Sequence, residues 1–358
     1  VIGVEWLYKG LEQYSYITIR SIIFKFIALV LMFVFVKNQG DYVIYGAISI
    51  VAGVGSNLLN FMNLRKYVDL RPVKHYNLKR HLKAVTIFFL MSVSTTIYTN
   101  LDTVMLGFMK DDAAVGYYSA AVKVKSLLVS FVTALSAVLL PRVSYYIEHK
   151  KQEEFIRVSR KALNFTVLVA LPVVVYFILF AKESIYLLSS EAYHASILPM
   201  QIIMPTILLI GLTNVLGIQI LVPLGKESLV FYSVLIGAIT DFVVNLVCIP
   251  SFSVAGAAFG TLVAEAVVLI VQLVMMHKQI QGLFSDIKPV KISVAVFAAA
   301  IVSVGVKVLR MGNLQTLLLS VCIFIIVYAA LLIVMKEPLF LELFENTIVK
   351  RLRKKHKQ

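Results

Sequence analysis

The sequence has 358 residues, of which 60% are hydrophobic and only 15% are charged, and its mean hydropathy is +0.89. Soluble domains typically carry about 25% charged residues, so this composition excludes a water-soluble globule and also a disordered or fibrous chain. The formal net charge of +15 would favour nucleic-acid binding in a soluble protein, but here it fits the basic loops of a membrane protein. We therefore expect an all-α, polytopic membrane protein with no nucleic-acid partner.

Ten stretches of the sequence are long and apolar enough to cross a membrane as helices. A helix needs about 20 apolar residues to span the hydrocarbon core of a bilayer. The stretches are 17–36, 42–61, 84–109, 115–140, 162–181, 197–222, 229–249, 254–276, 291–309 and 314–334. Short polar segments separate them, and even the longest loop, 62–83, leaves no room for a soluble domain.

Positively charged residues divide unequally between the two sides that these stretches define. Lys and Arg number 26 on the side that holds the start, the loops after even-numbered stretches and the tail, against 4 on the other side. Cytoplasmic loops carry this excess in membrane proteins, so both ends of the sequence are expected in the cytoplasm. The basic tail begins with apolar residues, and it fits either an amphipathic helix on anionic lipid or a solvated tail.

The sequence shows no pattern that is typical of an enzyme or a metal site. Cys248 and Cys322 lie in apolar runs, and the six histidines lack metal-ligand spacing. No nucleophile elbow, glycine-rich phosphate loop or catalytic carboxylate pair occurs. The run from Gly256 to Gly260 has instead the small-residue spacing of close contacts between membrane helices. We expect no cofactor and no metal.

Polar side chains recur along one face of the stretch 115–140. They are spaced three or four residues apart, as neighbours on one side of a helix are: Ser119, Lys123, Ser126, Ser130, Thr133 and Ser136. A polar face of this length is not expected to face lipid, so it should face protein or water. Lys125 lies about 200° from Lys123 around the helix and needs a different partner.

The stretch 84–109 carries a second polar face, with Asn100 and Asp102 beside it. Asp102 lies about 7 Å and Lys123 about 12 Å inward from the same membrane surface, so the two side chains could pair. One interpretation is a structural ion pair that lines nothing. The other is a polar, net-cationic cavity, which the serines and threonines of both faces favour. The candidate substrate-cavity residues are Asn100, Asp102, Lys123, Lys125, Ser126 and Ser130.

Two acidic residues in consecutive stretches form a candidate cation site. Asp241 and Asn245 are four residues apart, as are Thr261 and Glu265, and both acids lie at similar depth. Ionisable residues inside membranes usually face a partner or a cavity and can exchange a proton or hold Na⁺. Asp241, Glu265 and Asn245 are therefore candidates for coupling to H⁺ or Na⁺. The alternative is that each acid bonds separately to a neighbouring helix.

Five segments resemble the Wzx-type flippases of O-antigen, capsule and related polysaccharides, which belong to the multidrug/oligosaccharidyl-lipid/polysaccharide exporter superfamily. They are EWLYKGLEQY at 5–14, ITIRS at 17–21, IYTNLDTVMLG at 97–107, VGYYSAAVK at 115–123 and LLPR at 139–142. These segments keep the family's order and spacing, whereas the later stretches match mainly by pattern. The sequence therefore resembles members of this family.

The resemblance implies a bundle of two six-helix lobes, often with two further helices, in the bacterial cytoplasmic (inner) membrane. Such proteins move undecaprenyl-pyrophosphate-linked oligosaccharide to the outer leaflet by alternating access, driven by a cation gradient, and a polysaccharide polymerase is a conceivable partner. The expected divisions are the last two helices of the first lobe at 1–61, a basic loop at 62–83, the second lobe at 84–276, two additional helices at 277–334 and the tail at 335–358. Because the sequence begins with Val1, the first four helices are expected to be missing.

Three other function classes fit the sequence less well. A drug exporter of the same superfamily would want an acidic, aromatic cavity, which Lys123 and Lys125 disfavour. A membrane-embedded polysaccharide polymerase or ligase would need a long outer loop with catalytic residues, and the longest outer loop, 182–196, has few ionisable groups. A purely structural membrane protein would not need the polar faces. A flippase is therefore the predicted function.

Overall fold

The computed structural model describes residues 4–69, 79–277 and 282–344, and every regular element in these ranges is a helix. The chain divides into two compact units, Val1–His81 and Leu82–Gln358. The basic end of the predicted tail, 345–358, lies outside the described residues. The all-helical prediction is confirmed, and helices cover each of the ten predicted stretches.

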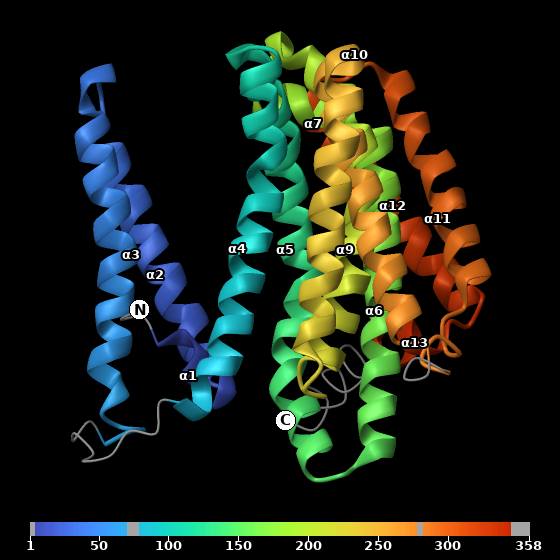
Figure 1. The fold of residues 1–358 in the computed structure, drawn as a ribbon. Coiled ribbons are helices and arrows are strands. Elements are labelled where there is room, and N and C mark those ends of the chain that lie inside the picture. The colour runs from blue at the N-terminus through green and yellow to red at the C-terminus, as the bar shows by residue number, and fades with distance from the viewer. Residues whose placement is uncertain (1–3, 70–78, 278–281, 345–358) are drawn as a thin grey trace, which may run out of the picture. The chain divides into compact units, whose positions relative to one another are not determined.

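The first unit is a helical hairpin with a short helix packed on it. Its elements are α1 (Glu5–Gly10), α2 (Tyr14–Phe35), the 3₁₀ turn η1 (Gln39–Asp41) and α3 (Tyr42–Leu64). Helices α2 and α3 lie side by side (Figure 1). The Tyr8 hydroxyl donates to the Asn60 carbonyl at 2.7 Å, which ties α1 to α3. At the turn, the backbone N–H groups of Lys37 and Asn38 donate to the Asp41 carboxylate and lower its pKa.

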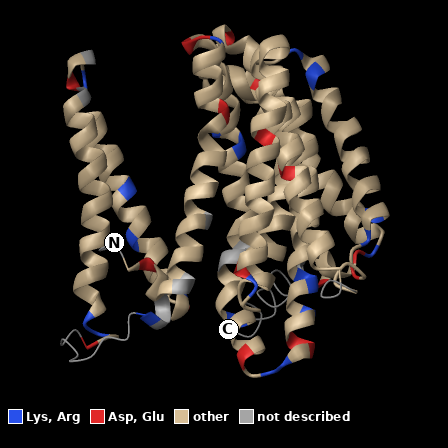
Figure 2. Ribbon diagram, in the orientation of Figure 1, with Lys and Arg blue, Asp and Glu red and all other residues tan. Residues whose placement is uncertain are grey.

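The second unit is a helical bundle that begins within α4 (Figure 1). Its elements are α4 (Lys79–Met109), α5 (Asp112–Glu148), α6 (Gln152–Leu179), α7 (Ala181–Leu188), η2 (Glu191–Ser196), α8 (Ile197–Ile203), α9 (Thr206–Asn214), η3 (Val215–Leu221), α10 (Glu227–Met275), α11 (Pro289–Val304), η4 (Gly305–Leu309), α12 (Asn313–Val334) and α13 (Pro338–Phe344). Figure 2 shows charged residues mainly toward the helix ends, with few along the middle of the bundle. This distribution suits helices that cross a membrane.

By length and apolarity, seven of the described helices qualify as membrane spans, or eight if the bent pair Glu191–Ile203 and Thr206–Leu221 forms one span. This is fewer than the ten predicted stretches, for two reasons. Helix α10 contains two stretches but counts once, and α4, which covers 84–109, is outside the seven. At 1.5 Å per residue the 49 residues of α10 would extend about 74 Å, more than twice the hydrocarbon core, so α10 must turn back.

Helix α10 is a hairpin that turns at Ser253, whose φ of 49° and ψ of −125° are not helical. The two arms are in close contact through glycines. A Cβ atom on Gly256 would lie 2.4 Å from the Cys248 carbonyl oxygen, and one on Gly260 would lie 2.1 Å from the Asn245 side chain. The predicted helix-contact role of these two glycines is confirmed. The hairpin also brings Asp241 and Glu265 onto adjacent arms, as their spacing predicted.

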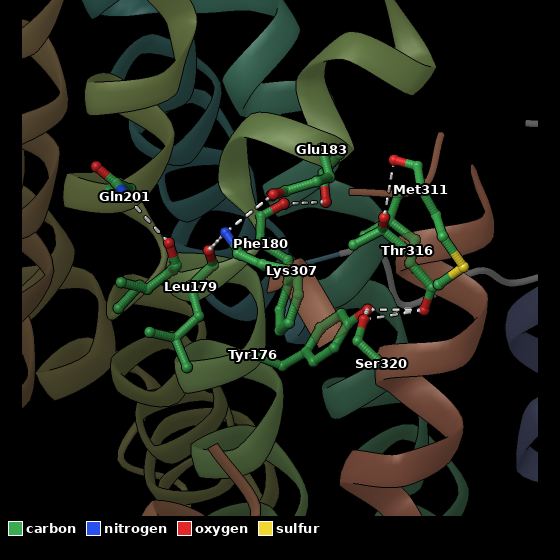
Figure 3. Close-up of polar contacts among 12 residues, drawn as sticks. Tyr176, Leu179, Phe180, Glu183, Gln201, Lys307, Met311, Thr316 and Ser320 are labelled. Carbon is green, nitrogen blue, oxygen red and sulfur yellow. Dashed lines mark hydrogen bonds and ion pairs between the residues drawn. The ribbon is translucent and has the colours of Figure 1, made fainter. Parts of the chain in front are cut away.

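Helices α11 and α12 are attached to the rest of the second unit by polar contacts at the break between α6 and α7 (Figure 3). A helix end leaves carbonyl groups without a partner in the helix. Lys307 of η4 donates to the Leu179 carbonyl at 2.8 Å and pairs with Glu183 of α7 at 2.9 Å. Gln201 of α8 donates to the Ile178 carbonyl at 3.1 Å. Side chains from two other elements therefore satisfy the carbonyls that the break exposes.

Tyrosine side chains fix α12 along the length of α6. The Tyr176 hydroxyl bonds the Ser320 hydroxyl at 2.9 Å and the Leu317 carbonyl at 3.0 Å (Figure 3). Nearer the other end, the Tyr328 hydroxyl donates to the Leu168 carbonyl at 2.8 Å. The two additional helices are therefore packed on the bundle as part of the second unit.

Candidate functional site

A buried hydrogen-bonded cluster joins three helices of the second unit around Asp102 of α4. The Asp102 carboxylate accepts from the hydroxyl of Tyr118 on α5 and, at 2.8 Å, from the hydroxyl of Thr261 on the second arm of α10. Its other oxygen accepts from the side-chain amide of Asn245, on the first arm of α10, at 2.5 Å. Tyr118 and Thr261 also bond one another at 2.9 Å. We call these four residues the Asp102 cluster.

The Asp102 cluster places a carboxylate where water has little access. Asp102 is 3% exposed, Tyr118 1% and Asn245 fully buried. Burying a charge is costly unless hydrogen bonds satisfy it, and here three donors share the two carboxylate oxygens. The cluster therefore fixes α4 and α5 against both arms of the α10 hairpin.

A cavity of about 640 Å³ opens beside the cluster. It is bounded by α4, α5, α9, η3 and α10, so it lies wholly within the second unit. Five of the six predicted substrate-cavity residues line it: Asn100, Asp102, Lys125, Ser126 and Ser130. The structure brings these residues together as the sequence predicted, although their proposed contact with substrate stays a prediction.

The charge of this cavity differs from the expectation. Among the described residues that line it, Lys125 is the one Lys or Arg, and it is accompanied by two carboxyl groups, those of Asp102 and Glu265. The cavity is therefore not net-cationic. Its mixture of one amine and two acids suits a small cation or proton better than a pyrophosphate group.

The predicted ion pair between Asp102 and Lys123 is wrong. Lys123 is exposed and lies outside the residues that line the cavity, whereas Asp102 is buried in its cluster of neutral donors. The reason is the rotation of α5. Tyr118 and Lys125 are seven residues apart and share the side that faces the cavity, while Lys123 lies about 140° around the helix from Tyr118. The polar face predicted on this helix thus only partly overlaps the face that meets the cavity.

The three predicted cation-coupling residues lie close to this cavity on the α10 hairpin. Asp241 is fully buried, and its carboxyl group lies beside that of Asp102, with no hydrogen bond from a neutral donor among the described residues. Its acidic neighbours are Asp102 and Glu265. Asn245, predicted to accompany Asp241 and Glu265, instead donates to Asp102. Asp102 was expected in the substrate cavity alone, so the structure connects the two predicted groups into one site.

Sequence reasoning missed the role of Tyr118. The residue belongs to the segment VGYYSAAVK, but a tyrosine in an apolar helix is usually a packing residue. The available signal was its spacing from Lys125, since residues seven apart lie on one side of a helix. Thr261 was placed near the acids, but its bond to Asp102 spans 159 residues and required the α10 hairpin to be known.

Comparisons with known families match two overlapping parts of the chain. The family described as "Polysaccharide biosynthesis protein" matches residues 1–147, and the family described as "MatE" matches residues 88–247. Three residues of the Asp102 cluster lie within the MatE match, and Thr261 lies beyond its end at residue 247.

Curated relatives with similar sequences carry transporter and flippase names. A "Putative O-antigen transporter" of Escherichia coli (strain K12) is 24% identical over 268 residues, which cover 74% of this chain and 64% of that protein. The "Probable flippase AglR" of Haloferax volcanii is 27% identical over 190 residues, 52% of this chain and 39% of that protein. The chain therefore spans just under two thirds of the length of the first of these relatives.

A solved structure shows the same fold. The lipid II flippase MurJ, in an inward closed conformation, superposes with a TM-score of 0.63 at 17% identity. The similarity covers 92% of this chain and 67% of that one. At this identity the comparison shows the arrangement of helices alone.

Proposed function

The chain belongs to the polysaccharide biosynthesis/MatE family of the multidrug/oligosaccharidyl-lipid/polysaccharide exporter superfamily, and on that premise we propose that the complete protein flips a lipid-linked oligosaccharide across a membrane. The family consists of transporters and flippases rather than enzymes, and the chain is a multi-pass membrane protein with a MurJ-like exporter fold. The observation that carries the proposal is the sequence match to O-antigen transporters over 74% of the chain.

The proposed substrate is an undecaprenyl-pyrophosphate-linked oligosaccharide destined for a cell-surface polysaccharide such as O-antigen or capsule. The proposed location is the bacterial cytoplasmic membrane, with both ends of the chain in the cytoplasm, which the excess of Lys and Arg on one side supports. Lys123 would contact the anionic substrate, because it is an exposed cation in the first third of α5 and does not pair with Asp102 as the sequence predicted.

The Asp102 cluster, Asp241 and Glu265 would form the coupling site for H⁺ or Na⁺. A buried carboxyl group is costly to ionise beside other carboxyl groups, and Asp241 has those of Asp102 and Glu265 as neighbours, with the Lys125 amine also nearby. A bound proton or Na⁺ would remove that cost. Because the cluster ties α4 and α5 to both arms of α10, occupancy would change how tightly these helices pack. Alternating access driven by the ion gradient would follow.

Complementation tests the proposed function. In a bacterial strain that lacks its own O-antigen flippase, the complete protein should restore surface polysaccharide. Lys123→Met should reduce this restoration, while Lys182→Met, which changes an exposed lysine of α7 rather than α5, should not. Normal membrane levels of the protein without any restored polysaccharide would contradict the proposal.

A separate measurement tests the coupling role. The Asp241→Asn and Glu265→Gln variants should restore surface polysaccharide to an extent that no longer depends on the proton or sodium gradient, so that collapse of the gradient has no effect. The matched control is Glu153→Gln, which changes an exposed acid in the first turn of α6. If both site variants keep the gradient dependence of the unchanged protein, these acids are structural.

An exporter of organic cations is the second candidate function. It is favoured by the MatE match over residues 88–247 and by the two carboxyl groups that line the cavity beside one lysine. Increased resistance of expressing cells to organic cations, without restored polysaccharide, would select this function over the flippase.

A further inference from the structure

A basic pocket lies at the end of the second unit where α6, α11 and α13 meet. Its volume is about 300 Å³. The elements in contact here include α6 with α11 and α6 with α13 (Figure 1). The polar residues that line it are Arg160, Lys161 and Asn164 of α6, Asp286 and Lys288 before α11, and Glu342 of α13.

Two donors and one acceptor in this pocket have no adequate partner among the residues that the structure describes. The Arg160 guanidinium reaches Asp286 only at 3.8 Å, and its buried Nε atom has no hydrogen-bond partner. Asn164 is 4% exposed, yet its side-chain oxygen has no partner among the described residues. Its amide makes only long contacts, at 3.4 Å to the Glu337 carboxylate and 3.5 Å to the Asp286 backbone carbonyl. Lys288 is exposed at the pocket's edge. Buried polar groups are normally satisfied, so the pocket is built for a ligand that both accepts and donates.

An apolar groove of about 490 Å³ starts beside this pocket. It runs between α6 and α12, with α13 closing one end and one side chain from α5 contributing. Its main lining residues are Phe165, Leu168, Pro172, Tyr176, Phe324 and Tyr328. The groove is almost wholly apolar, and two of its lining residues, Phe131 and Ile325, are exposed at the surface, where lipid chains would lie in a membrane.

The pocket and the groove adjoin on two elements. On α6, Asn164 lines the pocket and the next residue, Phe165, lines the groove. On α13, Leu339 lines the pocket and Phe340 lines the groove. A single molecule with a polar end and an apolar chain could therefore occupy both at once.

We propose that this pocket and groove bind an anionic phospholipid with a hydroxyl-bearing headgroup, such as phosphatidylglycerol. The phosphate accepts from Arg160, Lys288 and the Asn164 amide, and a headgroup hydroxyl donates to the Asn164 oxygen. One acyl chain lies in the groove. From Phe165 to Tyr176 the groove follows α6 for about 17 Å, close to half of the roughly 30 Å hydrocarbon core. That length fits the acyl chain of one leaflet and is too short for an undecaprenyl chain.

Native mass spectrometry of the complete protein tests this site. The protein, released from detergent with defined lipids, should retain phosphatidylglycerol in preference to phosphatidylcholine with the same acyl chains. Replacing both Arg160 and Lys288 by alanine should weaken this preference roughly 30-fold, since two cations near the lipid surface are lost. The matched control, Lys182→Ala, removes an exposed lysine in the first turn of α7 and should leave the preference unchanged.

A second variant tests the groove without touching the pocket. Ile325→Trp replaces a half-exposed aliphatic side chain of the groove by a larger aromatic one and should reduce retention of both phospholipids equally. The proposal fails if the unchanged protein shows no preference for phosphatidylglycerol, or if the control variant loses it as fully as the double variant. It also fails if undecaprenyl phosphate displaces phosphatidylglycerol and the double variant weakens both lipids alike.

Discussion

Replacing Asn245 by aspartate should destabilise the second unit more than any neutral substitution in the Asp102 cluster. The change preserves shape but converts the donor that faces Asp102 at 2.5 Å into a second carboxylate. Tyr118 and Thr261 cannot compensate, because they bond the other oxygen of Asp102. Adding Asp102→Asn to this variant restores one donor and one acceptor across the same contact, so the double swap should recover most of the lost stability.

The expected magnitude follows from the contact distance and the burial. Two unit charges 2.5 Å apart repel by about 7 kcal/mol at an effective dielectric constant of about 20, which sets a ceiling. Leaving a buried charge without its partner typically costs about 3–5 kcal/mol. We therefore expect Asn245→Asp to lower the free energy of unfolding by about 3–5 kcal/mol. The coupling between the two substitutions should be at least about 2 kcal/mol in favour of the double swap.

The assay is a double-mutant cycle on the complete purified protein, unfolded by denaturant in mixed micelles. The four proteins are the unchanged chain, Asn245→Asp, Asp102→Asn and the double swap. Asp102→Asn alone should cost little, because Asn245 can rotate its amide to present the oxygen. If the double swap is as unstable as Asn245→Asp alone, the two side chains are not in direct contact and the description of the cluster is wrong.

Two further predictions concern the parts that hold the site in place. Gly256→Ala should lower the free energy of unfolding by about 1–3 kcal/mol, because the new methyl group would lie 2.4 Å from the Cys248 carbonyl oxygen. The control Gly116→Ala, which adds a methyl group in open space, should leave the free energy of unfolding nearly unchanged. Lys307→Met should lower the thermal unfolding midpoint, because the Glu183 side chain, which is 12% exposed, loses its cation. The double variant Lys307→Met, Glu183→Gln should regain part of this loss. Equal midpoints for the single and double variants would contradict the reasoning.

Local features of the sequence predicted much of the fold. Apolar length fixed the positions of the helices, and the spacing of Gly256 and Gly260 indicated the close contact between the arms of α10. These properties depend on residues near one another in the chain, and hydrophobicity and steric size largely determine them.

The candidate site could be predicted only in part, because its contacts join distant residues. Periodicity identified polar faces on two helices but not how far each helix is rotated, so Lys123 was paired with Asp102 although Lys125 is the lysine that reaches the cavity. The bond between Asp102 and Asn245 spans 143 residues and depends on how α4 packs against α10. Side-chain depth along a helix limits which pairs can meet, but packing between helices decides which of them do.

The account's central claim is that the complete protein flips a lipid-linked oligosaccharide, and transport in reconstituted vesicles tests it most directly. Vesicles containing the purified complete protein receive fluorescent undecaprenyl-pyrophosphate oligosaccharide, and a membrane-impermeant reductant destroys the fluorescence in the outer leaflet. With an imposed proton or sodium gradient, the fraction of substrate accessible to the reductant should change faster than in protein-free vesicles. In the Asp241→Asn variant, the gradient should no longer change this rate. Accessibility that changes no faster than in protein-free vesicles under either gradient, while the protein is correctly folded, would contradict the claim.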